Sequence, residues 1–115
     1  MTSIKIQKPW GSELKFTKES LPYAGKIITI KNGKRLSLQK HSEKIETILL
    51  QKGKCLLKVG EKEIEMKPMH GYTINKNVVH RLTAIETSQI IEVSTPEKGI
   101  TYRLEDDYDR ANEKY

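Results

Sequence analysis

The sequence has a single cysteine, few aromatic residues and no long hydrophobic run. Cys55 cannot form a disulfide within the chain, so we expect a reducing, cytoplasmic setting. No apolar run approaches the roughly 20 residues that cross a bilayer. Residues 1–11 also lack the apolar segment of a signal peptide. These absences predict a protein that has no membrane partner.

The basic charge of the chain raises the question of nucleic acid binding. The formal net charge is +6, from 21 Lys and Arg against 15 Asp and Glu. The cationic residues are spread over every segment, and one Phe and one Trp offer little surface for base stacking. We therefore expect no nucleic acid partner. The positive field would favour a small molecule that carries a phosphate or a carboxylate.

Short strand-like runs separated by turn residues make up most of the chain. This pattern predicts an all-β sandwich or barrel, and 115 residues suit one domain over residues 1–115. The polar tail after residue 104 is expected to be irregular or a short helix. The predicted strands cover residues 4–8, 12–17, 26–31, 35–41, 46–51, 55–59, 62–66, 72–75, 78–85, 89–94 and 100–104.

Three turns are predicted with particular residue chemistry. Asn32-Gly33 is typical of a β-hairpin, because both residues accept a positive φ. Residues 52–54 (Lys-Gly-Lys) are expected to separate two strands. Residues 75–77 (Asn-Lys-Asn) predict a tight turn, in which Asn tolerates a positive φ better than most residues.

Four polar residues have the spacing expected of a metal site. Gln39 and His41 are two positions apart, so on a strand they lie on the same side. Glu46 begins the next apolar run after a turn, and His80 begins a later one. Each of these residues alone is more often a surface residue than a ligand. Together they predict one divalent metal ion inside a small β-barrel, since imidazole, carboxylate and amide groups are suitable ligands.

The same residues resemble a known family. The stretch of about 33–53 resembles the first cupin motif, with Gln39 where many cupins have His, and about 71–84 resembles the second. The whole chain resembles the cupin domain of type II mannose-6-phosphate isomerases, which also forms the C-terminal part of bifunctional mannose-1-phosphate guanylyltransferases. The matching residues are Lys8-Pro9-Trp10-Gly11, residues 33–41, Glu46, Gly53, His80-Arg81-Leu82 and residues 103–108.

The resemblance implies a single cupin jelly-roll domain with a short polar C-terminal tail beyond the barrel. It also implies a metal-dependent isomerase that converts mannose 6-phosphate to fructose 6-phosphate through a cis-enediol. Zinc is the first choice of metal, with Mn, Fe, Ni or Co as alternatives. The expected partners are a sugar phosphate and, by analogy with other cupins, a second copy of the chain in a homodimer.

One departure from the family leaves a second function open. The family's His-rich run after the position of His41 is replaced by Ser42-Glu43-Lys44. If one of the missing histidines transfers the proton, the chain would not isomerise mannose 6-phosphate. The alternative is a cupin that binds a metal and a sugar or small carboxylate without catalysis, or with another specificity, in polysaccharide or nucleotide-sugar biosynthesis.

Further residues are candidates for substrate contacts and catalysis. Glu43 is a candidate general base beside the ligand loop, with a solvated turn residue as the alternative. Arg35 shares the side of Gln39 by alternation, so it is a candidate phosphate contact. Trp10 could stack on a sugar, or it could be a plug in the core or at the barrel mouth. Arg81 follows His80 and is expected to point away from the site.

Overall fold

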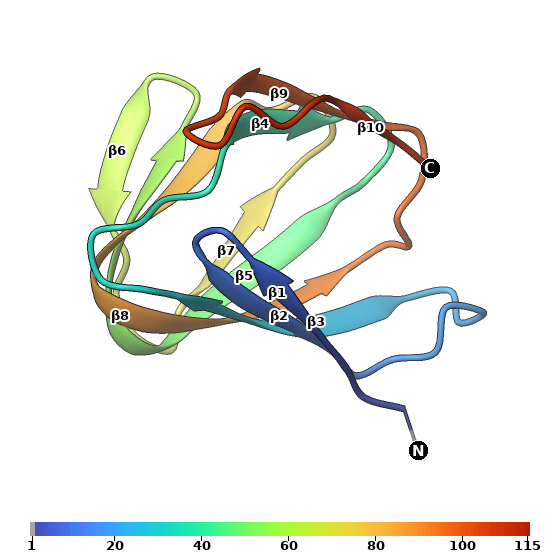
Figure 1. The fold of residues 1–115 in the computed structure, drawn as a ribbon, viewed down its shortest axis with the longest axis horizontal. Helices are drawn as coiled ribbons and strands as arrows, with labels where there is room; N and C mark the ends of the chain where they lie inside the picture. The colour runs from blue at the N-terminus through green and yellow to red at the C-terminus, as the bar shows by residue number, and fades with distance from the viewer. Residues whose placement is uncertain (1) are drawn as a thin grey trace.

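The computed structural model describes residues 2–115; Met1, the first residue of the predicted domain 1–115, lies outside them. The described residues form ten strands and no helix long and apolar enough to cross a membrane. The all-β prediction is therefore confirmed (Figure 1). The strands are β1 (Ile4–Lys8), β2 (Gly11–Lys15), β3 (Ala24–Ile30), β4 (Leu38–His41), β5 (Glu46–Val59), β6 (Lys62–Glu65), β7 (Gly71–Ile74), β8 (His80–Ser94), β9 (Ile100–Glu105) and β10 (Glu113–Lys114).

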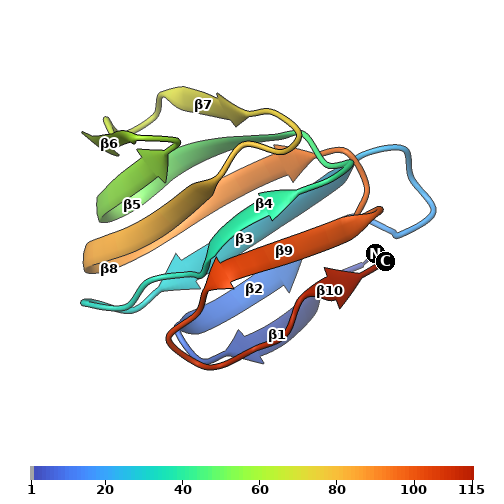
Figure 2. The ribbon, with the colours of Figure 1, turned by 90° about the horizontal axis from the view of Figure 1, so that it is seen from above.

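The strands pair antiparallel in one sheet that curls on itself (Figures 1 and 2). The main path runs β1-β2-β3-β8-β4-β9-β10, while β5 pairs with β6, β7 and β8. The long strand β8 connects the two sides of the barrel, because Ser88–Ser94 pairs with β3 and His80 pairs with β4. The edges β1–β2 and β9–β10 consequently face each other across the opening in Figure 1.

The interior of the barrel is apolar at one end and charged at the other. Alternation on β5 places Glu46 on the buried side together with Ile48 and Leu50. On β8 the same alternation buries His80 and Glu92 among apolar neighbours. The apolar core consists of Trp10, Ile28, Ile30, Leu36, Ile48, Leu50, Cys55, Leu57, Met66, Ile74, Leu82, Ala84 and Ile90.

Two pairs of predicted strands are single long strands in the structure. Residues 46–51 and 55–59 both belong to β5, and residues 78–85 and 89–94 largely to β8. The predicted turn at residues 52–54 is a bulged stretch in which the register with β8 shifts. Gly53 has a φ of 98° there, and a Cβ at this position would lie 2.4 Å from the Thr87 carbonyl oxygen. The glycine thus marks a bulge, since no side chain fits this close approach.

Two other local predictions are also corrected. The Asn32-Gly33 turn forms, with the Lys34 N–H donating to the Lys31 carbonyl at 2.9 Å. However, β3 and β4 on either side of it do not pair with each other, because both pair with β8. The C-terminal tail, predicted to be irregular or helical beyond the barrel, ends in β10, which pairs with β9.

The predicted turn at residues 75–77 is confirmed and supports the site. Asn77 has a φ of 61°, in the left-handed region. Its N–H donates to the His41 carbonyl at 2.8 Å, and the Val78 N–H donates to the Asn75 carbonyl at 3.3 Å. The turn therefore fixes the end of β4 against the start of β8.

We expect Asn77→Val to lower the free energy of unfolding by about 1–2 kcal/mol, because a β-branched side chain is unfavourable at positive φ. Asn77→Gly is the matched control and should leave stability nearly unchanged. Chemical denaturation of the three proteins measures the difference. Equal stability of the Val and Gly variants would contradict this account of the turn.

Candidate metal centre

His41, Glu46 and His80 come together from the ends of three strands. His41 is the last residue of β4, Glu46 the first of β5 and His80 the first of β8. All three are buried, and one ligand atom from each lies within 4.8 Å of the others. Nε2 of His80 is 3.1 Å from Oε1 of Glu46, and Nε2 of His41 is 3.9 Å from Oε2. Two imidazoles thus face one carboxylate.

The hydrogen bonds at the Nδ1 atoms determine which imidazole nitrogens are free. Nδ1 of His80 lies 2.9 Å from the Val78 carbonyl oxygen, which can only accept, so this nitrogen carries a proton. Nδ1 of His41 lies 2.8 Å from Oγ1 of Thr101. The Thr101 hydroxyl donates to the Tyr115 hydroxyl at 3.1 Å and therefore accepts from His41. In the neutral form of both rings, the Nε2 lone pairs point toward Glu46.

This donor set fits a divalent metal ion. Nε2 of His80 is buried and has no hydrogen-bond partner, since its approach to Glu46 is not aligned as a hydrogen bond. Burial and the Lys44 charge lower the pKa of His41 to about 4, which leaves its imidazole neutral at pH 7. Burial alone would raise the pKa of Glu46, but the charge of Lys44, 3.1 Å away, lowers it below the ordinary range. Two imidazoles and a carboxylate are typical ligands of Zn and related ions.

Gln39 lies beside this cluster. Gln39 on β4 pairs with His80 on the neighbouring strand β8 and with Arg103 on the other neighbour, β9. The three side chains therefore share the inward face of β8, β4 and β9. Its Oε1 accepts a hydrogen bond from the Ser37 hydroxyl at 3.2 Å. Gln39 borders the same cavity as His41 and Glu46. Its role as a ligand stays a prediction.

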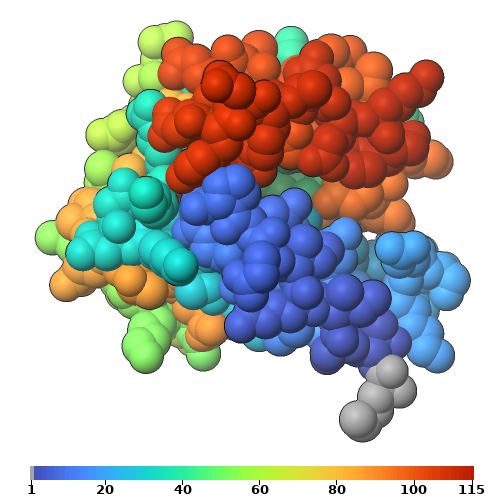
Figure 3. Space-filling model, in the orientation of Figure 1, coloured from blue at the N-terminus to red at the C-terminus, as the bar shows by residue number. Residues whose placement is uncertain are grey.

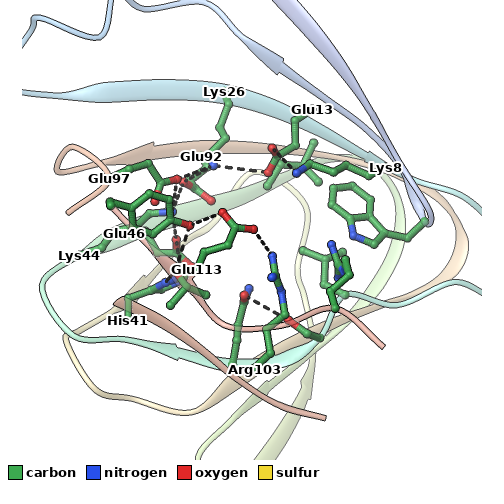
Figure 4. Close-up of a pocket in the computed structure, with 18 of the residues that line it drawn as sticks. Lys8, Glu13, Lys26, His41, Lys44, Glu46, Glu92, Glu97, Arg103 and Glu113 are labelled. Carbon is green, nitrogen blue, oxygen red and sulfur yellow. Dashed lines mark hydrogen bonds and ion pairs between the residues drawn. The ribbon is translucent and has the colours of Figure 1, made fainter. Parts of the chain in front are cut away.

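The cluster opens into a cavity of ≈ 100 Å³ that is rich in charge (Figure 4). Nζ of Lys44 lies 3.1 Å from Glu46, 3.0 Å from Glu92 and 3.3 Å from Glu97. Lys26 pairs with Glu97 at 3.0 Å and more distantly with Glu92. Charged side chains from three strands (β3, β5 and β8) and two loops therefore neutralise one another inside the barrel.

Two candidate site residues, Arg35 and Glu43, lie outside the cavity. Arg35 forms a bidentate ion pair with Asp107 at 2.7 and 2.8 Å and does not border the cavity. The expected alternation from Arg35 to Gln39 fails because the strand begins only at Leu38 and its register shifts there. Glu43 is exposed and lies against Gly99, outside the cavity lining. The proposed roles of both side chains stay predictions without geometric support.

The positions of Trp10 and Arg81 agree better with the predictions from the sequence. Trp10 is buried in the core and also forms part of the cavity wall, so both of its predicted roles remain open. Arg81 points away from the cavity, as expected, and donates to the Leu36 carbonyl and to Glu105.

The sequence interpretation did not identify Lys44, Glu92 and Arg103 as cavity residues. Lys44 belongs to the predicted turn between His41 and Glu46, and its side chain is only 4% exposed. Glu92 follows the inward alternation of Ile90 on β8, which could have identified it as buried. Arg103 lies opposite Gln39, and this register between β9 and β4 has no local sequence signature.

Comparison with solved structures identifies the class of fold. KdgF from Halomonas sp. is 12% identical with a TM-score of 0.73, covering 85% of this chain and 88% of its own. The cupin domain of Schizosaccharomyces pombe Cnp3 is 15% identical with a TM-score of 0.66, and the match covers 74% of this chain and 60% of that one. A protein from Acidithiobacillus ferrooxidans, provisionally named a sugar phosphate isomerase, is 13% identical with a TM-score of 0.69. The match covers 88% of this chain and 72% of that one. The predicted cupin fold is confirmed.

A family model assigns the chain more narrowly. The model described as "Mannose-6-phosphate isomerase C-terminal" matches residues 1–113. The chain therefore belongs to this family, and the resemblance inferred from its motifs is confirmed. A search of curated proteins gives no match.

We expect Thr101→Val to weaken Zn²⁺ binding by roughly 10- to 100-fold, because it removes the acceptor that orients the His41 ring. His41→Ala should abolish binding at this site, while the exposed His70→Ala should bind as the wild type does. Titration with Zn²⁺ under a competing chelator, after purification without an affinity tag, measures the affinities. Equal affinity of wild type and Thr101→Val would contradict the orienting role.

We expect the stability contributed by Glu97 to disappear at acid pH. Burial opposes its ionisation, but Lys44 and Lys26 outweigh it and lower the pKa of this carboxyl to about 2, from 4.5. Between these values the unfolded chain binds a proton that the folded chain does not, so unfolding becomes easier as the pH falls.

Near pH 7, Glu97→Gln should therefore have a free energy of unfolding lower than that of the wild type by up to about 3 kcal/mol. This difference in stability should become smaller toward pH 2. Denaturation curves at several pH values measure it. Glu43→Gln, at an exposed site, is the control and should show no such gap. A difference between wild type and Glu97→Gln that does not change with pH would rule out this contribution.

Proposed function

We propose that this protein is a metal-dependent isomerase of a sugar phosphate, with mannose 6-phosphate and fructose 6-phosphate as the pair it interconverts. The observation that carries the proposal is the convergence of two imidazole Nε2 atoms on the Glu46 carboxylate inside a polar cavity. Membership of the mannose-6-phosphate isomerase C-terminal family supports the choice of substrate. A sugar-phosphate isomerase name on one structural neighbour is consistent with it.

His41, Glu46 and His80, with Gln39 beside them, would hold the metal, and zinc is our first choice. When bound, the ion would act as a Lewis acid toward the oxygens of the reacting carbons. The chain's own contribution is orientation: Thr101 and the Val78 carbonyl keep both imidazoles turned toward Glu46. The surrounding barrel wall shields this arrangement from bulk water.

A general base must also lie within the cavity. Glu92 borders it and is buried, whereas Glu43 is exposed and outside it. Burial and the charge of Glu46 raise the pKa of Glu92, although Lys44 opposes this. A raised pKa brings a carboxyl closer to the range of an efficient base. We therefore place proton transfer at Glu92 and not at Glu43.

We expect metal-loaded protein to convert mannose 6-phosphate to fructose 6-phosphate, detected by enzymatic coupling or by NMR of the sugar. His80→Ala should remove activity, and Glu92→Gln should lower kcat by roughly 10²- to 10⁴-fold. Glu43→Gln is the matched control and should retain activity. Full activity of Glu92→Gln would reassign the base, and a metal-loaded wild type without turnover would overturn the isomerase.

One observation favours a second candidate, a cupin that binds metal and a sugar or carboxylate without turnover. Lys44, which replaces part of the family's His-rich run, lies 3.1 Å from Glu46. A cation at this position competes with a metal for the carboxylate. Sugar phosphate binding without isomerisation in the assay above would support this candidate.

For either function, the buried Cys55 suits the cytoplasmic location we propose. The homodimer stays an untested proposal.

A further inference from the structure

Arg103 is a nearly buried cation on the cavity wall with an incomplete set of partners. Its side chain is only 9% exposed. Nη2 pairs with the Glu113 carboxylate, and Nη1 donates to the Ala111 carbonyl. Nε is buried and has no hydrogen-bond partner. A guanidinium has five N–H donors that suit an oxyanion. The Nε–H of Arg103 is unused although burial makes an unpaired donor costly.

The register of the sheet places Arg103 in line with the metal centre. Arg103 on β9 is opposite Gln39 on β4, which is opposite His80 on β8. Adjacent strands lie about 4.8 Å apart, so the backbone at Arg103 is roughly 10 Å from that at His80. A ligand held at the metal centre by its oxygens could therefore place an anionic group at the other end of the cavity, against Arg103.

The carboxylate of Glu113 is the only anion that Arg103 contacts through its side chain among the described residues. Glu113 lies opposite Thr101, so it projects inward from β10 over the metal centre. Its second oxygen accepts from the Tyr115 hydroxyl at 3.0 Å. Figure 4 shows this carboxylate in the middle of the cavity, directed at the Arg103 guanidinium.

The cavity is small, and Glu113 is one of the side chains that border it. The cavity measures ≈ 100 Å³, whereas small-molecule sites usually offer roughly 300–1,000 Å³. Glu113 and Tyr115 from the C-terminal segment both border it. This segment covers the opening beside the N-terminal strands (Figure 3), and β10 is only two residues long and pairs with β9 alone.

We propose that Arg103 is the oxyanion-binding residue of this cavity, and that Glu113 occupies its site until a ligand's phosphate displaces it. The cavity is lined by six cationic and five anionic side chains, so removal of Glu113 leaves an excess of positive charge for a dianion. The proposal rests on the proposed function only for the identity of the anion as a sugar phosphate. Arg103 thereby determines specificity for phosphorylated over neutral sugars.

Isothermal titration with inorganic phosphate, mannose 6-phosphate and mannose tests this at constant ionic strength. Glu113→Gln removes the competing charge, and we expect phosphate to bind about tenfold more tightly than to the wild type. Asp109→Asn removes one charge from the same segment at an exposed position and should bind as the wild type does. Arg103→Gln should bind phosphate at least tenfold more weakly.

Equal affinities of Glu113→Gln and Asp109→Asn, or unchanged phosphate binding by Arg103→Gln, would overturn the proposal. Tighter binding of acetate than of phosphate would do the same. If Arg103→Gln does not fold, the Arg103 Nε–H resonance in Glu113→Gln decides, because it should shift on addition of phosphate and stay fixed if the site lies elsewhere. Isomerase activity is measured separately. Phosphate binding at Arg103 without turnover of mannose 6-phosphate would refute only the isomerase. Turnover without the expected changes in phosphate affinity would refute only the Arg103 site.

Discussion

The burial of Glu46 is the constraint on which this site depends. Alternation on β5 turns its side chain into the barrel together with Ile48 and Leu50, and an unpaired carboxylate in such surroundings is very costly. Its two oxygens are met by His80 on one side and Lys44 on the other, with His41 nearby. His41 ends a strand, His80 begins one and Lys44 lies in the loop between β4 and β5, so these polar groups enter the barrel without disturbing the apolar half of the core.

Local sequence patterns predict the elements of this fold better than their connections. Period-two alternation and turn residues located nearly every strand, and the predicted turn at residues 75–77 contains an Asn, Asn77, at positive φ. The same reasoning divided β5 at Gly53, because a glycine that permits a bulge and one that ends a strand look alike in sequence. It also treated Asn32-Gly33 as a hairpin, although the pairing of β3 and β4 with β8 is decided by contacts far along the chain.

The residues of the candidate site show the same difference between local patterns, which could be predicted, and contacts between distant strands, which could not. His41, Glu46 and His80 could be named from spacing because each lies at a strand end that the pattern defines. Arg35 was the predicted phosphate contact because alternation was extended from Gln39 back along the chain, and Arg103 was not considered for this role. In the structure the cation nearest to Gln39 on the inward face comes instead from β9. Side chains that meet across strands depend on register, and register between distant segments is set by the whole sheet.

Lys44 compensates the charge of Glu46 from within the chain. A ligand cluster of two imidazoles and a carboxylate often forms only with its metal, and then metal binding is part of folding. Here the ammonium of Lys44 already compensates Glu46, and burial does not discharge it, since Glu92, Glu46 and Glu97 raise its pKa against the cost of desolvation. An arriving cation would take over one oxygen of Glu46, and Lys44 would keep Glu92 and Glu97. The charged half of the barrel would therefore keep its charges paired when an ion is bound.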